Sequence, residues 1–148
     1  MVNIELIKQL RDETEISIGE CKKALETSGG DIDRAKEILK EWGKNVATKK
    51  GDRCTGQGKI EAYIHANGKI GVIVELRCET DFVANSDDFK NLAHELCLQY
   101  TATGDDPETI LTSPWIKNPS KTVQDLVNET IAKVGENIVV KKVVRLQI

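Results

Sequence analysis

The sequence predicts an α+β protein in which an amino-terminal bundle of three helices precedes a three-stranded antiparallel sheet covered by helices. As far as Gly43, the apolar residues recur at helical spacing. From Gly56 onward they alternate with polar residues, as in strands that bury one face. The pair Asn67-Gly68 stands between two alternating runs and is the strongest short signal for a hairpin. The change of periodicity therefore separates a helical region from a sheet region.

The first two helices are predicted from their apolar period and their end signals. Apolar residues from Ile4 to Leu10 follow a helical period. Ser17 and Glu20 have the spacing of a capping box, which can begin a second helix, and Gly29-Gly30 can end it.

A third helix and a linker are expected next. Asp31 can cap this helix, and Gly43 is expected to stop it. The basic run over 44–55 is more typical of a solvated linker than of an RNA contact. We therefore predict two domains, a bundle at 1–43 and an α+β core at 56–148. Such a small bundle resembles the ubiquitin-associated type of domain, which presents an apolar patch around the turn between its first two helices.

The core is expected to begin with the hairpin. Its first strand alternates through Ile60, Ala62 and Ile64, and its second extends from Ile70 to Cys78. Both runs keep the two-residue period of a pleated strand on either side of the turn.

Two helices and a last strand complete the predicted core. Ser86 can cap a helix that covers the sheet. The segment 103–120, which includes Gly104-Asp105-Asp106-Pro107, is rich in turn formers and predicts a loop with a short helical piece. A helix from Val123 would stop at Gly135, and a strand over 138–146 would join the hairpin.

Composition places limits on the function. The chain has 148 residues and a formal charge of −3, with basic and acidic residues interleaved, which argues against a general nucleic-acid binder. No apolar run approaches the roughly 20 residues that span a bilayer, and the amino terminus lacks the basic and then apolar pattern of a signal peptide. We therefore expect a cytoplasmic protein with no membrane contact.

Metal and catalytic chemistry find little support in the sequence. The four cysteines, Cys21, Cys54, Cys78 and Cys97, are irregularly spaced, which disfavours zinc. Their even number permits disulfides, but reduced core thiols are favoured because nothing indicates secretion. His65 and His94 have no recognisable nucleophile motif near them, and no phosphate-binding loop motif is present. We expect neither an enzyme nor a cofactor.

Three motifs together resemble one protein family. Cys78 to Asn85 reads CETDFVAN, Glu20 to Leu25 reads ECKKAL within a matching stretch from Asp12, and Lys133 to Ile138 reads KVGENI. Their content and order resemble elongation factor Ts, the nucleotide exchange factor of the translational GTPase elongation factor Tu. The chain looks like a short form with one sheet-and-helix unit. The resemblance implies that a homodimer through the core domain would cover surfaces that the long form buries.

The sharpest candidate site is Asp81-Phe82. The resemblance implies that this turn enters the GTPase near its magnesium ion, with Phe82 as a wedge and Asp81 fixing it, while Thr80 and Val83 shape the turn. From spacing alone, Asp81 could instead be a helix cap and Phe82 a core residue.

Two further contacts with the GTPase are implied by the family. Val134 and Gly135 align with a contact position, although Gly135 also reads as a plain helix stop. In the bundle, the turn from Ile16 to Lys22 is implied to contact a GTPase helix, with Ile16 and Ile18 apolar and Lys22 charged. This turn departs from the family's usual pattern, because residues 14–19 read TEISIG where small residues and methionines are commoner, and Gly19 removes one side chain.

The function implied is guanine-nucleotide exchange on elongation factor Tu. An adaptor of the ubiquitin-associated kind, which binds a partner helix or nascent chain without exchange activity, is the alternative. It would need only residues 1–43 and would leave Asp81-Phe82 without a role. A small hydrolase is the third hypothesis, and no catalytic constellation supports it.

Overall fold

The computed structural model describes residues 1–104 and 106–148. Its amino-terminal part consists of three helices, α1 (Ile4–Thr14), α2 (Ile18–Thr27) and α3 (Ile32–Lys50). A side chain caps the start of each helix. As predicted, the Ser17 hydroxyl accepts from the Glu20 N–H (3.4 Å), and the Asp31 carboxylate accepts from two N–H groups of the first turn (3.0 Å each). The helices pack around a small core of their own. It consists of Leu10, Cys21, Ala24, Leu25, Ala35 and Leu39.

The third helix does not stop at Gly43, and this prediction was wrong. α3 continues to Lys50, so the first half of the predicted linker at 44–55 is helical. Gly43 is buried, and a Cβ built on it would lie 3.8 Å from the Cβ of Ala132 in α7 (Val123–Val134). Val46 and Ala47 pack against the core of the sheet region. This packing offsets the roughly 1 kcal/mol by which glycine disfavours a helix interior.

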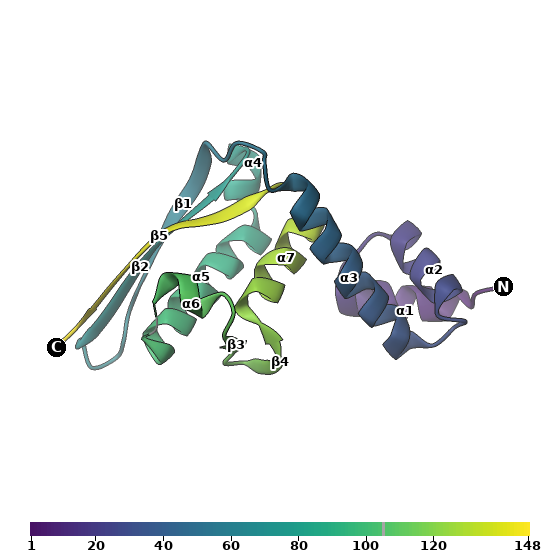
Figure 1. Cartoon of the computed structure of the whole chain (residues 1–148), viewed down its shortest axis with the longest axis horizontal. Coiled ribbons are helices and arrows are strands. Elements are labelled where there is room, and N and C mark those ends of the chain that lie inside the picture. Colours follow the sequence, from purple (N-terminus) through teal and green to yellow (C-terminus); the bar gives the residue numbers. More distant parts are fainter. Residues whose placement is uncertain (105) are drawn as a thin grey trace.

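The sheet has three antiparallel strands in the order β1-β2-β5, with β1 spanning Gln57–Ile64, β2 Ile70–Cys78 and β5 Ile138–Gln147. The predicted hairpin is confirmed. Gly68 in its turn has a φ of 70°, which glycine adopts without strain, and the Asn67 side chain accepts from the Lys69 N–H (2.9 Å). The α+β fold class is therefore as predicted (Figure 1).

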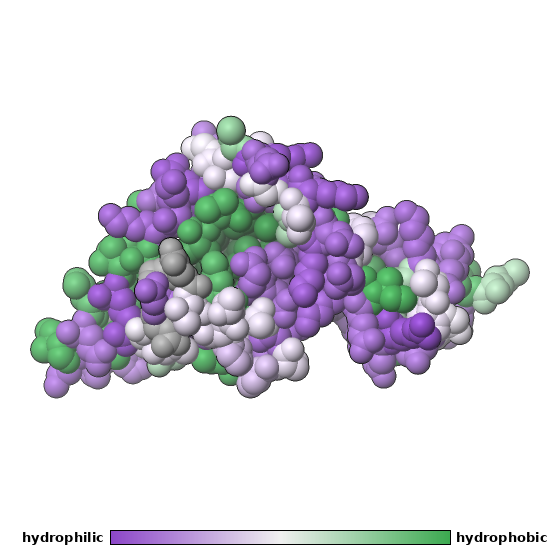
Figure 2. Space-filling model, in the orientation of Figure 1, coloured by the Kyte–Doolittle hydropathy of each residue, from purple (hydrophilic) through white to green (hydrophobic). Residues whose placement is uncertain are grey.

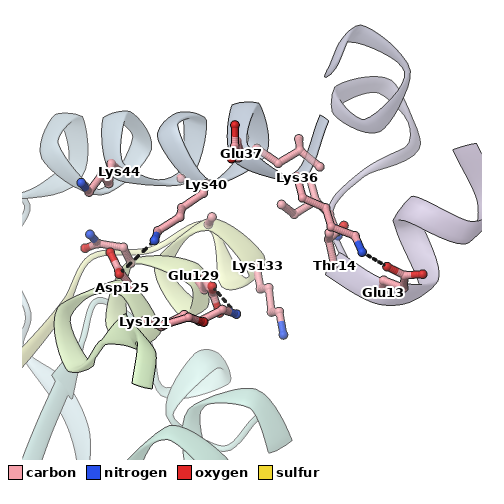
Figure 3. A pocket seen from close by; sticks show the side chains of 16 residues that line it. Glu13, Thr14, Lys36, Glu37, Lys40, Lys44, Lys121, Asp125, Glu129 and Lys133 are labelled. Carbon is pink, nitrogen blue, oxygen red and sulfur yellow. Dashed lines mark hydrogen bonds and ion pairs between the residues drawn. The ribbon is translucent and has the colours of Figure 1, made fainter. Parts of the chain in front are cut away.

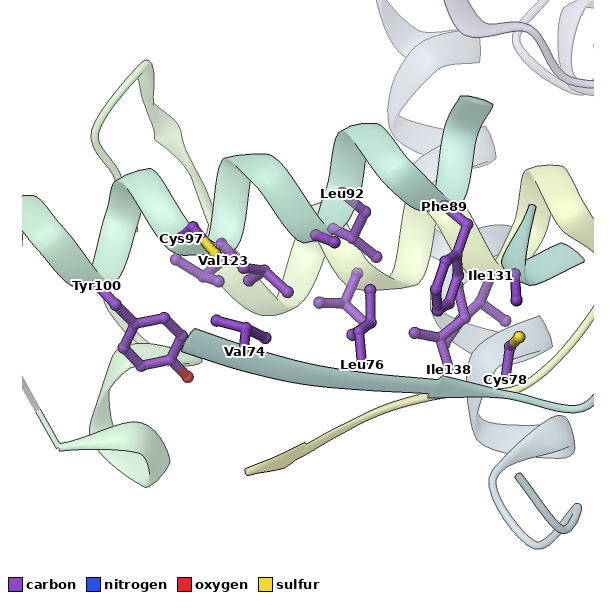
Figure 4. Close-up of a cluster of buried hydrophobic side chains, with 14 of the residues drawn as sticks. Val74, Leu76, Cys78, Phe89, Leu92, Cys97, Tyr100, Val123, Ile131 and Ile138 are labelled. Atoms are coloured by element: carbon purple, nitrogen blue, oxygen red, sulfur yellow. The ribbon is translucent and has the colours of Figure 1, made fainter. Parts of the chain in front are cut away.

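Two helices, α5 (Asp87–Thr103) and α7, cover one face of the sheet. Figure 4 shows Val74 and Leu76 of β2 facing Phe89 and Leu92 of α5. The predicted Ser86 cap is present, because its hydroxyl accepts from the Phe89 N–H (3.3 Å). α7 begins with a capping box formed by Thr122 and Asp125 and ends at Gly135, as predicted.

The other face of the sheet is open. The register pairs Ile60 with Glu75 and Ala62 with Ile73, so the apolar alternation of β1 lies opposite the helices. Ile60 is 72% exposed and Ile64 65% exposed. Figure 2 shows that apolar residues gather at the sheet end of the visible face, whereas the surface of α3 is mainly hydrophilic.

The predicted loop at 103–120 contains more structure than expected. Beside the short helix α6 (Pro107–Ile110) it includes a small hairpin of β3 (Pro114–Trp115) and β4 (Asn118–Thr122). The buried Gln99 side chain holds this hairpin, because it donates to the Pro114 carbonyl (3.1 Å) and accepts from the Ile116 N–H (2.9 Å). Asp105 of the predicted turn lies outside the described residues.

A search of the described ranges for membrane-crossing helices found none that combines the required length with the required apolar character.

Candidate functional site

Two segments leave the sheet side by side at the end of β2. Cys78 and Ile138 form the last pair between β2 and β5. Beyond this pair, Glu79 leads into the short helix α4 (Asp81–Ala84), and on the other side α7 ends at Gly135. The motif at 78–85 and the motif at 133–138 are therefore neighbours in space, although Thr80 and Glu136, which are hydrogen-bonded, lie 56 positions apart along the chain.

The turn at α4 presents Phe82 to solvent. Phe82 is 86% exposed and Asp81 is also exposed, whereas Val83 and Ala84 on the opposite side are buried at 5% and 0% exposure. Thr80, rather than Asp81, caps the helix, because its hydroxyl accepts from the Val83 N–H (3.3 Å). The interpretation of Phe82 as a core residue and of Asp81 as a cap is therefore wrong.

The candidate residues around this turn divide into two groups. Asp81 and Phe82 are available to a partner, and Thr80 is exposed while it caps the helix. Val83 lies in the core of this chain and supports the turn from beneath. It is thus placed to shape the turn rather than to contact a partner.

Val134 and Gly135, where α7 ends, form the second part of the candidate site. Val134 is half-buried and packs against the core. Gly135 has a φ of 75°, and its N–H donates to the Ile131 carbonyl (2.9 Å), which ends α7. Its carbonyl accepts from the Lys50 ammonium at the end of α3. A positive φ and the lack of a side chain explain why glycine stands here.

Carboxylates cross-link these two segments. The Glu136 carboxylate accepts from the Thr80 N–H (2.9 Å) and the Thr80 hydroxyl (2.7 Å). In return, the Glu79 carboxylate accepts from the Asn137 N–H (2.9 Å). Glu79 also lies 3.6 Å from Arg53. Sequence reasoning did not assign roles to Glu79, Glu136 or Asn137, although all three lie within the motifs at 78–85 and 133–138 that carry the resemblance.

The buried Asn137 side chain ties the same end to the segment after α3. Its amide donates to the carbonyls of Gly51 (3.3 Å) and Arg53 (3.0 Å). Hydrogen bonds therefore join three stretches of chain, at 51–53, 79–80 and 136–137, at the end of the sheet from which α4 starts.

The turn between α1 and α2, at residues 16–22, lies apart from the end of the sheet that carries α4. Figure 1 shows α1 and α2 at one end of α3 and α4 near the other. Ile18 is 58% exposed, Ile16 is half-buried against the bundle core, and Lys22 is exposed at 3.9 Å from Glu26. The structure does not bring these three residues into the site at α4. They form a second surface.

An ion pair joins the bundle turn to α7. Glu15, which adopts a left-handed φ of 57°, lies 2.9 Å from Lys133. The hydrogen bond and charge of Lys133 lower the pKa of Glu15. Lys133 precedes Val134, so the turn of the bundle is linked to the residue next to the site.

A cleft of about 430 Å³ separates the bundle from the core (Figure 3). Ion pairs cross or line it, including Lys40 with Asp125 (3.3 Å) and Lys121 with Glu129 (2.8 Å). Since these lysines are matched by carboxylates, the cleft offers no concentrated charge of one sign.

The cysteines are free thiols, as favoured from the sequence. Cys21, Cys78 and Cys97 are buried, and Cys54 is exposed. Burial raises the pKa of Cys97 to about 12. Within residues 1–104 and 106–148, no three His, Cys, Asp or Glu side chains are grouped as metal ligands would be.

Comparison with known proteins bears directly on this end of the molecule. The family model described as "Elongation factor TS" matches residues 79–148, which include both α4 and the segment after α7. The elongation factor Ts of Coprothermobacter proteolyticus is 42% identical, over 97% of this chain and 96% of the relative. The elongation factor Ts of Rubrobacter xylanophilus is 38% identical, over 98% of each.

The chain belongs to the elongation factor Ts family. Membership makes it a translation elongation factor, as the three motifs indicated. The family protein of Thermotoga neapolitana is likewise 38% identical, over 99% of this chain. The alignment with the Coprothermobacter protein spans 190 positions against this chain's 148 residues, so at least 42 positions have no counterpart here.

Proposed function

We propose that this chain is a guanine-nucleotide exchange factor that promotes GDP release from elongation factor Tu. The observation that carries the proposal is Phe82, a large aromatic side chain that is 86% exposed on a turn whose cap is hydrogen-bonded to the neighbouring segment. Exposing an aromatic ring forgoes roughly 2 to 3 kcal/mol of burial, which a folded chain regains only by contact with a partner.

The turn acts as a wedge. A GTPase holds its nucleotide largely through a magnesium ion and the loop that cradles the phosphates. Phe82 enters beside these elements and displaces them, and the Asp81 carboxylate fixes the turn through polar contacts. Val134 and Gly135 contact the GTPase beside the turn, because the missing side chain of Gly135 lets a partner approach the backbone. The chain makes and breaks no covalent bond and only speeds the release of a bound nucleotide, so it is not an enzyme.

The bundle anchors the complex. Ile18 supplies exposed apolar surface, Ile16 supports it, and Lys22 adds a charge contact at the same turn. An adaptor function would use this surface alone and would leave Phe82 unexplained. Action on a translational GTPase places the protein in the cytoplasm.

We also propose that a second copy of this chain covers the open face of the sheet. This face carries exposed apolar side chains, which include Ile60, Ile64 and Ile73. Of its charged residues, Glu75 and Arg77 pair with each other at 2.6 Å, and Lys142 lies opposite Glu75 in the register, so charges of both signs are side by side on this face. Sedimentation should show a dimer that Ile73→Lys converts to a monomer. A monomeric wild-type chain at micromolar concentration would reject this dimer.

GDP release tests the exchange proposal. Elongation factor Tu loaded with a fluorescent GDP analogue is mixed with excess unlabelled GDP and a small amount of the chain. We expect faster loss of fluorescence, with each molecule of the chain acting many times. Because the chain and GDP weaken each other's binding by the same factor, GDP and magnesium should both lower its affinity for the GTPase. An affinity that does not change with GDP or magnesium would show that exchange is not the function.

A further inference from the structure

We propose that Glu136 is a positioning residue that aims Phe82, by holding the cap of α4 in a fixed relation to Gly135. This inference rests on the exchange function proposed above and names a residue outside the contact surface. Glu136 does its work through Thr80 and not through contact with the GTPase.

Both carboxylate oxygens of Glu136 are used on one residue. One accepts from the Thr80 N–H at 2.9 Å, and the other accepts from the Thr80 hydroxyl at 2.7 Å. The same hydroxyl then accepts from the Val83 N–H at 3.3 Å and so caps α4. A charged acceptor shortens and strengthens such hydrogen bonds, and two of them fix the orientation of Thr80 as well as its distance.

The position of Phe82 depends on this contact because α4 is too short to be stable without tertiary contacts. The helix has only four residues, and a single turn has too few internal hydrogen bonds to be stable alone. The burial of Val83 and Ala84 holds one side of it. The start of the helix lies beyond the last strand pair, where Glu136 supplies the connection to the neighbouring segment.

Glu136 and Glu79 have different surroundings. Glu79 accepts from the Asn137 N–H and also lies 3.6 Å from Arg53, so it has a cation beside it. Among the ion pairs of the described residues, none includes Glu136. Lys50, the nearby cation, donates to the Gly135 carbonyl. Glu136 therefore uses both of its carboxylate oxygens on Thr80, whereas Glu79, which also links the two segments, is shared between Asn137 and Arg53.

The experiment compares Glu136→Ala, Glu136→Gln and the matched control Glu129→Ala in the full chain. Glu129 lies on α7 and pairs with Lys121 on the surface, so its removal deletes a carboxylate without touching α4. The rate of fluorescent GDP release from elongation factor Tu is measured across a range of chain concentrations. This yields a maximal rate and a half-saturating concentration for each variant.

We expect Glu136→Ala to lower the maximal rate about 10-fold, which corresponds to the loss of a charge-assisted hydrogen bond. The half-saturating concentration should change less than about twofold, because the bundle anchor is intact. Glu136→Gln should recover most of the rate, since its amide can accept from the Thr80 N–H and donate to the hydroxyl. Glu129→Ala should match the wild type.

Two further measurements distinguish positioning from general stability. Glu136→Ala and Thr80→Ala should be non-additive in the maximal rate, because both remove the same contact. In the isolated chain, amide hydrogen exchange should become faster at Thr80 in Glu136→Ala while the core of α5 stays protected. Additive effects, an unchanged maximal rate or unchanged exchange at Thr80 would each overturn the proposal.

Failure of the exchange function would look different. If the wild-type chain did not accelerate GDP release at any concentration, the proposed function would be wrong for every variant alike. Amide exchange at Thr80 in the isolated chain would still show whether Glu136 holds the turn.

Discussion

The two phenylalanines of this chain lie seven residues apart and have opposite surroundings. Phe82 in α4 is 86% exposed, whereas Phe89 in α5 is fully buried against the sheet. The chain changes direction between them, because Asn85 ends α4 and Ser86 caps α5. The same side chain therefore serves stability at one position and is offered to a partner at the other. Residue type alone does not distinguish the two roles.

The core around Phe89 shows what burial contributes. Its ring packs among β2, α5 and α7 in the larger hydrophobic cluster (Figure 4). Around the start of α4, hydrogen bonds that carboxylates and a glycine carbonyl accept connect the segments. Apolar contacts stabilise the fold, and polar contacts give the exposed turn a defined direction.

Phe89→Ala should have the largest effect. It leaves a cavity in the core, so the free energy of unfolding should fall by about 3 to 5 kcal/mol. Urea denaturation followed by circular dichroism measures this loss. Phe89→Leu, which refills part of the volume, should be milder. A loss below about 1 kcal/mol for Phe89→Ala would mean that the ring is less tightly packed than its full burial indicates.

Phe82→Ala should show the reverse pattern. We expect GDP release from elongation factor Tu to fall about 30- to 100-fold, since burial of an aromatic ring contributes roughly 2 to 3 kcal/mol. The melting temperature should stay close to that of the wild type because the ring contacts solvent. Phe82→Leu should retain part of the activity. Wild-type activity without the ring would remove the wedge from the mechanism.

Local signals account for the parts of the fold that were predicted correctly. The caps at Ser17, Asp31 and Ser86 and the turn at Asn67-Gly68 involve residues close together in sequence. Their energetics depend on a few neighbouring backbone groups, which a single sequence displays directly.

Long-range contacts account for what was missed. Gly43 looked like a helix stop because its contact with Ala132 cannot be read from its neighbours. The β3–β4 hairpin depends on the side chain of Gln99, and the link from Glu136 to Thr80 joins residues 56 positions apart. The resemblance implied an exposed Phe82, whereas spacing alone also allowed a core position, because spacing does not show that the segment after β2 lies beside the end of α7.

Ile18→Ala should give a smaller effect and separate anchoring from release. Ile18 is 58% exposed, so a partner can bury only that part of its side chain, and truncation should cost about 1 kcal/mol of binding, or about fivefold in affinity. The half-saturating concentration should rise while the maximal release rate stays unchanged. Lys23→Ala, which removes an exposed residue paired with Glu20, is a control on the same helix. A lower maximal rate in Ile18→Ala would instead show that the bundle takes part in release.

The smallest expected effect concerns the joint between bundle and core, where Lys40 of α3 lies 3.3 Å from Asp125 of α7. Burial alone would raise the pKa of Asp125, but hydrogen bonds from Thr122 and the Lys40 ammonium outweigh it and lower the pKa. Because the folded-state pKa lies below the unfolded one, this carboxylate stabilises the fold above the unfolded pKa, about 3.9. That stability is lost as the pH falls through the folded-state pKa.

Asp125→Asn should remove this one contribution to the pH dependence. In urea denaturation between pH 3 and pH 6, a range that spans the ordinary aspartate pKa of about 3.9, the wild type should lose more stability on acidification than the variant. The two should differ most near pH 6, where the wild-type carboxylate is fully charged, and converge at the acid end. Parallel curves would show that Asp125 has the same pKa in both states. The joint would then be held by the packing of Gly43 against Ala132 and not by charge.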